Sequence, residues 1–220
     1  PFWESLMAIL PVCDEVIVTY AVDSEDQTFQ VLQRLAQLFP HLKLYPSEVW
    51  QDTQVLEGKR IALAANEARD YCQGDWLWHV QADEVYLKKD TLQVKALIQE
   101  YDHQAIDAFV FPILHFYGDY EHYVNQNGPQ EGWYLSCIRL ARRGKAQHIG
   151  DAWTQKIQDN QRLKSVDIPI FHYGHVREHE AMRLKSNYME RLYKPLPENF
   201  EVCPPQQFSY NRVPKHLLNV

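Results

Sequence analysis

The stretch "DWLWHVQADEVY", Asp75 to Tyr86, places two adjacent carboxylates directly after an apolar run. A short and continuously apolar run is typical of a strand that is buried on both faces of a sheet. Asp83 and Glu84 therefore follow the end of a strand, where they either cap the next element or hold a positive charge. The "EVYLKKD" that follows is only weakly helical, and Asp90 is itself a good cap for "TLQVKALIQEY", so capping by Asp83 is weakened but stays open.

Strands and helices alternate on the N-terminal side of this stretch. Val16 to Tyr20 and Leu42 to Tyr45 predict two strands, and apolar residues at helical spacing predict helices within 23–39 and 58–72. This alternation predicts a parallel sheet flanked by helices, in which ligands bind beyond the carboxyl ends of the strands. No strand precedes the helix and strand predicted at the start of the sequence, which raises the question of whether an N-terminal strand is missing.

The second half of the sequence changes character. The segments "DAFVFPILHFYG", "WYLSCIRLARRG" and "VDIPIFHYGHV" predict strands, and one clear helix follows from His179 to Tyr193. We expect an α/β half over 1–100, a mixed-strand half of the same domain over 101–194, and an extended tail over 195–220, because proline is frequent there.

The composition narrows the function classes. The 220 residues suit one large domain, and a formal charge of −7 without a Lys/Arg-rich stripe argues against a nucleic-acid binder. The four cysteines form no CxxC, which disfavours a zinc knuckle or a disulfide scaffold and favours a reducing, cytoplasmic setting. We find no eighteen-residue apolar run and no leader pattern, so we expect neither a transmembrane segment nor a signal peptide.

The alternative to capping is that Asp83, together with Glu84, supplies oxygen ligands to a divalent ion. Mg²⁺ or Mn²⁺ at a diphosphate keeps several waters and takes one or two protein carboxylates. At these residues the order "DEVIV…VDSEDQT", then "AANEARDYCQGDWLWHVQADEVY", resembles the family 2 glycosyltransferases of the GT-A fold, in which a strand ends in an Asp-x-Asp-like motif. Gln81 stands where the first Asp often lies, and Asp83 matches the metal-binding carboxylate. The likeness covers about the first hundred residues well and the rest loosely.

The resemblance also implies residues that bind the nucleotide. Asp23 matches the acid that hydrogen-bonds the base, and Asp26 matches the second acid of a D-x-x-D turn; the alternative for both is helix capping. The family places a nucleotide-contacting basic residue near Lys59 and Arg60, with Asn66 on the same predicted helix. Solvated surface charge is the usual alternative for such residues.

Two histidines and an arginine follow the last predicted strand, in "FHYGHVRE". In GT-A enzymes a late histidine completes the metal shell, a role for which His172 and His175 compete, and a late basic residue steadies the leaving diphosphate, which points to Arg177. The alternative for an isolated histidine is a structural role. Trp133 is the leading member of a candidate aromatic platform for the acceptor, although a core position is the alternative for each such ring.

An inverting transfer needs a general base for the acceptor hydroxyl. Asp151, in "HIGDAW", is the leading candidate because it follows a strand and a basic turn where relatives place an acid, and Glu131 is the alternate. Asp151 as a cap of a helix beginning at Ala152 and Glu131 as a solvated loop charge are the alternatives. The sequence contains no Gly-rich phosphate loop, Ser-His-Asp order or HExxH.

The sequence thus predicts an α/β, GT-A Rossmann-like, mostly parallel sheet flanked by helices, with a mixed-strand C-terminal half. We expect a metal-assisted glycosyltransferase that uses Mg²⁺ or Mn²⁺, a nucleotide-sugar donor and a glycan or other hydroxyl acceptor. A non-catalytic nucleotide- or glycan-binding module of the same fold is the rival. A metal-dependent phosphohydrolase is a third hypothesis.

Overall fold

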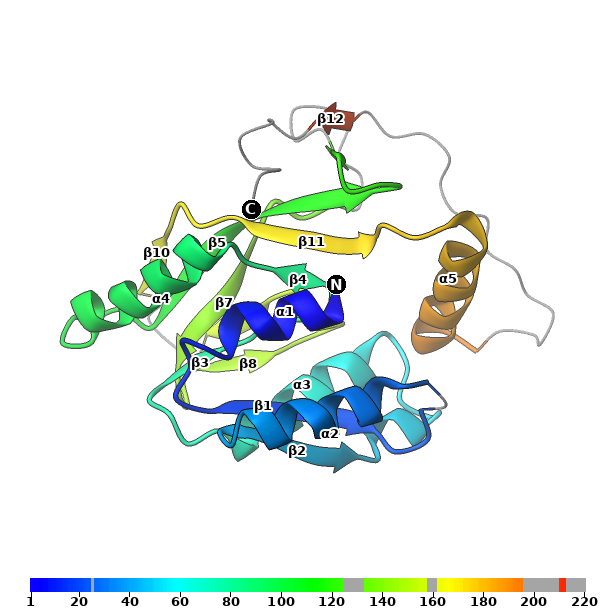
Figure 1. Ribbon diagram of the computed structural model, residues 1–220, viewed down its shortest axis with the longest axis horizontal. Coiled ribbons are helices and arrows are strands. Elements are labelled where there is room, and N and C mark those ends of the chain that lie inside the picture. The colour runs from blue at the N-terminus through cyan, green and yellow to red at the C-terminus, as the bar shows by residue number, and fades with distance from the viewer. Residues whose placement is uncertain (25, 125–132, 158–161, 196–209, 213–220) are drawn as a thin grey trace.

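The parallel pair β1 (Val16–Ala21) and β2 (Leu42–Ser47) forms the base of the fold in Figure 1, which draws the computed structural model of the chain. The structure describes residues 1–24, 26–124, 133–157, 162–195 and 210–212. The helices are α1 (Phe2–Ile9), α2 (Thr28–Leu38), α3 (Lys59–Tyr71), α4 (Lys88–Tyr101) and α5 (His179–Tyr193). The remaining strands are β3 (Trp76–Trp78), β4 (Glu84–Val85), β5 (Ala108–Tyr117), β6 (His122–Val124), β7 (Ser136–Arg142), β8 (Ala146–His148), β9 (Gln155–Ile157), β10 (Leu163–Ser165), β11 (Ile170–His175) and β12 (Tyr210–Arg212).

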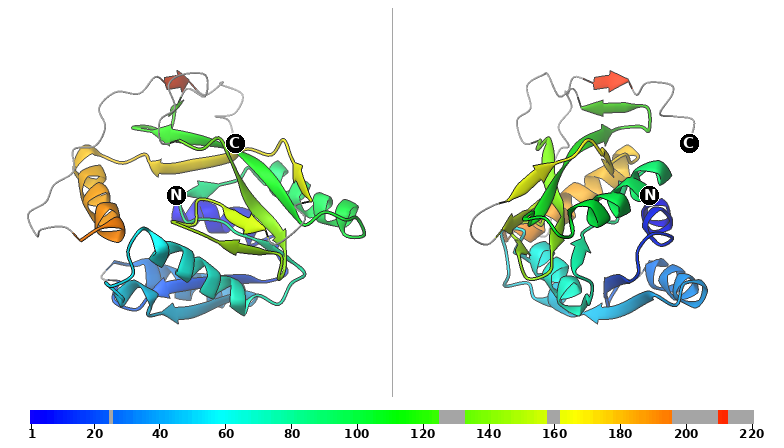
Figure 2. Two further views of the ribbon diagram at one scale, coloured as in Figure 1. Left: turned by 180° about the vertical axis from the view of Figure 1, so that it is seen from behind. Right: turned by 90° about the vertical axis from the view of Figure 1, so that its left-hand side faces the viewer.

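Apolar residues at helical spacing fix α1 and α2 on one face of the β1–β2 pair. Leu32 and Leu35 of α2 are fully buried and pack with Leu6 and Ile9 of α1 in one core cluster. Helix α3 lies on the opposite face, as the views from behind and from the side show (Figure 2). Helices therefore cover this pair on both faces, as the alternating pattern of the first hundred residues predicts.

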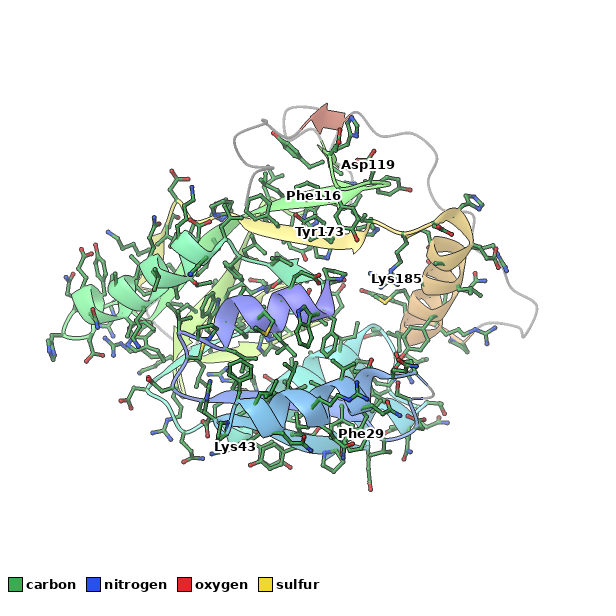
Figure 3. All side chains as sticks on the ribbon, in the orientation of Figure 1. Phe29, Lys43, Phe116, Asp119, Tyr173 and Lys185 are labelled. Carbon is green, nitrogen blue, oxygen red and sulfur yellow. The ribbon has the colours of Figure 1, made fainter. Side chains whose placement is uncertain are left out.

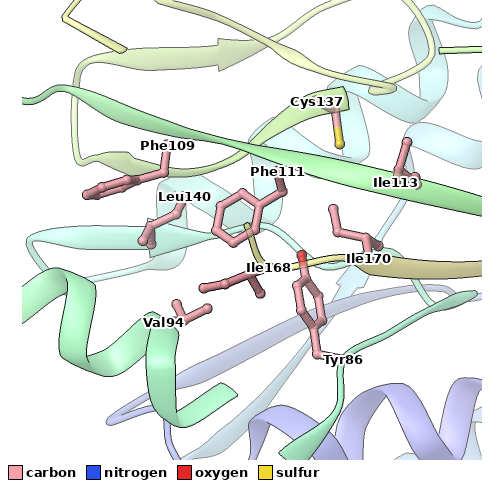
Figure 4. Packing of buried hydrophobic residues seen from close by; sticks show 9 residues of the cluster. All are labelled: Tyr86, Val94, Phe109, Phe111, Ile113, Cys137, Leu140, Ile168 and Ile170. Atoms are coloured by element: carbon pink, nitrogen blue, oxygen red, sulfur yellow. The ribbon is translucent and has the colours of Figure 1, made fainter. Parts of the chain in front are cut away.

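Strand β5 organises the second half of the fold. It pairs in parallel with β10 and β11 and antiparallel with β6 and β7, while β3 joins through β7 and β4 through β11. Its residues Phe109, Phe111 and Ile113 are fully buried in the main core against α4 (Figure 4). Because β3 belongs to the first half and β7 to the second, the two predicted halves share one sheet.

The mixed α/β class is confirmed, but the described sheets are mixed. Three strand pairings are parallel and six are antiparallel among the described residues. The parallel character predicted for 1–100 is present in the β1–β2 pair. Beyond it, β3 finds its described partner in the antiparallel β7.

Helix boundaries agree with the sequence except at α4. This helix begins at Lys88, so Asp90 lies inside its first turn and does not cap it. Burial of the Asp90 carboxyl raises its pKa, consistent with an interior position. Of the predicted tail 195–220, most lies outside the described residues. Within the described part of the chain, no helix is both long and apolar enough to cross a membrane.

Candidate functional site

The loop between β3 and β4 carries the two carboxylates that follow the buried strand. Its turn is closed by backbone N–H of Glu84, which donates to the Gln81 carbonyl at 3.0 Å, and by backbone N–H of Gln81, which donates to Glu84 Oε2 at 3.2 Å. The Ser5 hydroxyl of α1 also donates to the Gln81 carbonyl at 3.2 Å. A strand, β4, follows Asp83, so Asp83 is not a helix cap.

Glu84 is held by an arginine that the sequence did not single out. Glu84 and Arg139 of β7 are both fully buried, and the Arg139 guanidinium donates to both carboxylate oxygens at 2.6 to 3.1 Å. Burial works against the charge on Arg139, but the neighbouring carboxylate offsets this and raises the pKa of Arg139. Glu84 is therefore committed to a structural ion pair, and Asp83 is left as the carboxylate that faces the cavity.

Asp83 meets a lysine and a histidine. Lys185 Nζ, on α5, lies 3.2 Å from Asp83 Oδ2 and donates to the Gly174 carbonyl at 2.7 Å. Figure 3 shows the Lys185 side chain reaching from α5 toward the body of the protein. His172 Nε2 lies 3.7 Å from Asp83 Oδ1. Burial opposes ionisation of Asp83, but the adjacent His172 and Lys185 hold the pKa of its carboxyl below the ordinary value.

The hydrogen-bond chain behind His172 determines which of its nitrogens carries the proton. His115 on β5 is the register partner of His172 on β11, and their Nδ1 atoms lie 2.9 Å apart. His115 Nε2 lies 2.7 Å from the Tyr134 carbonyl, which only accepts, so this nitrogen carries the hydrogen. Burial lowers the pKa of His115 to about 4, which leaves its Nδ1 bare as the acceptor for His172 Nδ1–H.

His172 Nε2 consequently carries no hydrogen, and it lies 3.7 Å from Asp83 Oδ1. Burial also lowers the pKa of His172, which keeps the ring neutral at pH 7. Two lone-pair donors 3.7 Å apart suit a cation between them, since Mg²⁺ ligand bonds are about 2.1 Å long. A metal-ligating histidine usually donates its other N–H to a fixed partner, which is the arrangement of His172 and His115.

Within the described parts of the chain, Asp83 and His172 are the two side chains that could ligate a metal ion at this place. Among the described residues no group of three or more His, Cys, Asp or Glu side chains is arranged to hold a metal ion. A two-ligand site still fits an ion that also binds substrate phosphates and water. The residues present therefore fit a substrate-bridging ion, and they do not form a closed structural metal site.

Gly174 allows the close approach of Asp83 to His172. A Cβ added at this position would lie 2.7 Å from both Asp83 Oδ2 and His172 Nε2. Real Cβ contacts are longer, so any side chain at this buried position of β11 must displace both groups or shift the strand.

Gly174→Ala should therefore disturb the site while keeping the fold. We expect the free energy of unfolding to fall by about 1 to 3 kcal/mol, the usual cost of overpacking, in urea unfolding followed by circular dichroism. Gly74→Ala is the control, because its Cβ would meet no atom closer than 3.4 Å. Equal stability of the two variants would show that the Asp83–His172 geometry is looser than described.

An aromatic wall adjoins the pair. The ring of Trp133 lies 4.8 Å from those of both His115 and His175, measured between ring centroids. Burial and neighbouring positive charge lower the pKa of His175 to about 3, so this ring is neutral as well. The flat faces of Trp133 and His175 suit an apolar ring or a sugar face, as the sequence predicts for Trp133.

One cavity of about 1910 Å³ gathers most of the predicted site residues. It is lined by Gln81, Asp83, Trp133, Asp151, His172, His175 and Arg177, together with Lys185. Arg177 is exposed and forms no ion pair with any described residue. Lys185 lies beside Asp83, and Arg177 lines the same cavity, so the cavity offers cationic side chains that suit an anionic ligand.

Four predicted binding residues do not line the cavity. Arg60 is buried and donates to the backbone carbonyls of Trp50 and Arg191. Asn66 exchanges two hydrogen bonds with the backbone of His148. Both side chains of α3 therefore have structural partners.

The two acids after β1 are exposed. The Asp26 carboxylate accepts from the Thr28 backbone N–H at 2.9 Å, but the N-cap residue of α2 is Gln27, so Asp26 is not the helix cap. Asp23 lies near Tyr188 of α5, and its charge adds to the burial that raises the pKa of Tyr188. The structure therefore gives Asp26 a local partner and brings Asp23 toward α5.

Of the two candidate general bases, the structure describes Asp151 but not Glu131. Asp151 follows β8 and caps no helix; its carboxylate accepts from the Tyr193 hydroxyl and from the Trp153 backbone N–H. Glu131 lies outside the described residues. The described residues therefore do not identify a general base: the Asp151 carboxylate already accepts two hydrogen bonds, and nothing is described for Glu131.

Comparisons with known proteins add little. No family model matches the sequence, and no curated protein matches it. A similar solved structure is the crystal structure of S. aureus TarS 1-349, with a TM-score of 0.44 and 15% sequence identity. The match covers 78% of this chain and 56% of that chain. A likeness at this TM-score carries no weight for function.

Proposed function

We propose that the protein transfers a sugar from a nucleotide-diphosphate-sugar donor to a hydroxyl acceptor, in the manner of a family 2, GT-A glycosyltransferase. The observation that carries the proposal is the pair of lone-pair donors, Asp83 Oδ1 and His172 Nε2, beside Lys185 at the end of the β3 strand. Mg²⁺ or Mn²⁺ would be held by this pair. Because an imidazole is a softer ligand than a carboxylate, we expect Mn²⁺ to bind more tightly than Mg²⁺.

The metal would neutralise charge that builds on the departing diphosphate. Lys185 forms an ion pair with Asp83, with 3.2 Å between Nζ and Oδ2. A diphosphate bound beside Asp83 would therefore lie close to the Lys185 ammonium group. Arg177, exposed at the cavity, presents a guanidinium with the fork geometry that suits phosphate. These two side chains would position the diphosphate, and Trp133 would present a ring face to the sugar or the acceptor.

A donor panel tests the reaction. We expect nucleoside diphosphate release from at least one nucleotide sugar, dependent on Mn²⁺ or Mg²⁺, when donors are screened with hydroxyl acceptors. UDP or GDP with Mn²⁺ at about 100 times its dissociation constant should raise the melting temperature by about 5 to 11 °C. Release of inorganic phosphate in place of nucleoside diphosphate would instead indicate a phosphohydrolase.

A non-catalytic module that binds a nucleotide or glycan is the second candidate. It is favoured by Asp151, whose two carboxylate oxygens already accept hydrogen bonds from Tyr193 and Trp153. Stabilisation by UDP or GDP with Mn²⁺, without turnover of any donor, would select this candidate.

A further inference from the structure

Lys185 places a positive charge against the candidate metal ligand Asp83. Its Nζ atom lies 3.2 Å from Asp83 Oδ2 and donates to the Gly174 carbonyl at 2.7 Å. The Lys185 and Asp83 side chains are only 22% and 25% exposed, so water and salt screen the pair incompletely. The other oxygen of the same carboxylate, Oδ1, lies 3.7 Å from His172 Nε2. A divalent ion bound between these two atoms would therefore share one carboxylate with a lysine ammonium group.

Backbone hydrogen bonds at the end of α5 hold this lysine at the cavity. The Tyr193 carbonyl accepts from the backbone N–H of Glu57 at 3.1 Å. The Leu192 carbonyl accepts from the backbone N–H of Gly58 at 3.0 Å. The last carbonyls of a helix have no partner within the helix, so these bonds satisfy groups that would otherwise need water. Helix α5 is thus attached to the turn before α3 independently of Asp83, and the ammonium group stays near the cavity even when the ion pair opens.

The Asp83–His172 pair is a weak site for a bare divalent ion. Two protein ligands leave the ion dependent on water or substrate oxygens for the rest of its shell. A neutral imidazole adds no negative charge, so a single carboxylate faces both the ion and the Lys185 ammonium group. The charges of Asp83 and Lys185 sum to zero, which leaves little electrostatic attraction for a second cation.

We propose that Lys185 excludes a bare divalent ion from the Asp83–His172 pair, so that the ion enters together with the diphosphate of the donor. The part played by the diphosphate rests on the proposed function. Its oxygens would accept hydrogen bonds from the ammonium group in place of Asp83, and they would supply the missing metal ligands. A lysine has a flexible four-carbon stem and can change partners with a small movement of its side chain. Lys185 thereby determines which form of the metal the site takes, and binding of the ion and of the diphosphate become mutually dependent.

Equilibrium dialysis against MnCl₂, with and without UDP or GDP, tests the role of the Lys185 charge. Lys185→Met keeps much of the length of the side chain and removes its charge. We expect this variant to bind Mn²⁺ alone about ten- to a hundredfold more tightly than the wild-type protein, because a unit positive charge is removed from beside the ion. The nucleotide should then increase the Mn²⁺ affinity of the variant by a smaller factor than that of the wild-type protein.

Further variants separate the charge of the side chain from its shape. Lys185→Arg keeps the positive charge and should exclude Mn²⁺ as the lysine does. Lys43→Met is the matched control, because Lys43 forms an ion pair with Glu15 and does not line the cavity. Figure 3 labels Lys43 and Lys185 on different parts of the fold. Lys43→Met should leave Mn²⁺ binding unchanged, and Lys185→Gln repeats the test should Lys185→Met lose the circular dichroism spectrum of the folded protein.

Unchanged Mn²⁺ binding by the folded, uncharged variant would overturn the proposal, and so would tight Mn²⁺ binding by Lys185→Arg. The proposed function is judged separately, by turnover of a donor. Tighter Mn²⁺ binding by Lys185→Met, with no effect of UDP or GDP and no turnover, would uphold exclusion by Lys185 and reject the proposed function. Turnover of a donor together with unchanged Mn²⁺ binding by Lys185→Met would keep the proposed function and reject exclusion by Lys185.

Discussion

Asp83→Asn should reduce the stabilisation of the protein by UDP or GDP with Mn²⁺ from about 5 to 11 °C to below about 1 °C. The asparagine keeps the size of the side chain but removes the charge that a divalent ion needs beside His172 Nε2. It also leaves Lys185 without its carboxylate, so the site becomes more positive even without metal. Differential scanning fluorimetry with and without Mn²⁺ measures the shift.

Asp119→Asn is the matched control. Asp119 lies in the β5–β6 turn, bonds to His122 and does not line the cavity, so this variant should keep the full shift. The labels in Figure 3 locate Asp119 on that turn and Lys185 on α5. A full Mn²⁺-dependent shift in Asp83→Asn would place the ion elsewhere and would remove the basis of the proposed glycosyl transfer.

Most elements that the sequence predicted are long enough to show a period, and the three-residue β3 was predicted from its continuous apolar run instead. Helix α5 has the predicted ends, His179 and Tyr193, and β1 ends one residue after the predicted Tyr20. The structure adds β4, β6, β8, β9, β10 and β12, each of two or three residues. A strand that short contains no full alternation, so its existence depends on the pairing partner and not on its own pattern.

The residues of the site were also only partly predictable, because most of them are far apart in the sequence. Asp83 could be identified locally, because a carboxylate at the end of an apolar strand is unusual. Lys185 is 102 residues away and His115 is 57 residues from His172, and only the β5–β11 register and the placement of α5 bring them together.

Arg60 and Asn66 were predicted to bind a ligand, but the structure gives both side chains backbone partners. On a predicted helix they look like ligand contacts, but they bond to backbone groups that are 131 and 82 residues away. No helical period reports whether a polar side chain faces a ligand or a distant carbonyl. The register of strands and the packing of helices decide this, and neither is visible in a local pattern.

Glu84→Gln should lower the free energy of unfolding by about 3 to 5 kcal/mol, measured by urea unfolding. The change leaves the Arg139 charge fully buried without a counter-charge, and losing one partner of a buried pair costs far more than the pair itself contributes. The control is Glu180→Gln, which breaks the exposed pair with Arg183 and should cost less than about 1 kcal/mol. Similar losses in the two variants would show that Arg139 finds another partner or water.

Glu84→Leu combined with Arg139→Met tests whether the pair stabilises the fold or fixes the loop. Removing both charges should restore most of the stability lost in Glu84→Gln, since apolar replacement of a buried pair is often neutral. The Glu84 carboxylate also accepts from the Gln81 backbone N–H, so the double variant loses that hold on the turn carrying Asp83. We therefore expect the double variant to recover its free energy of unfolding but to show a smaller rise in melting temperature with UDP or GDP and Mn²⁺. A full rise in melting temperature together with recovered stability would assign Glu84 to folding alone.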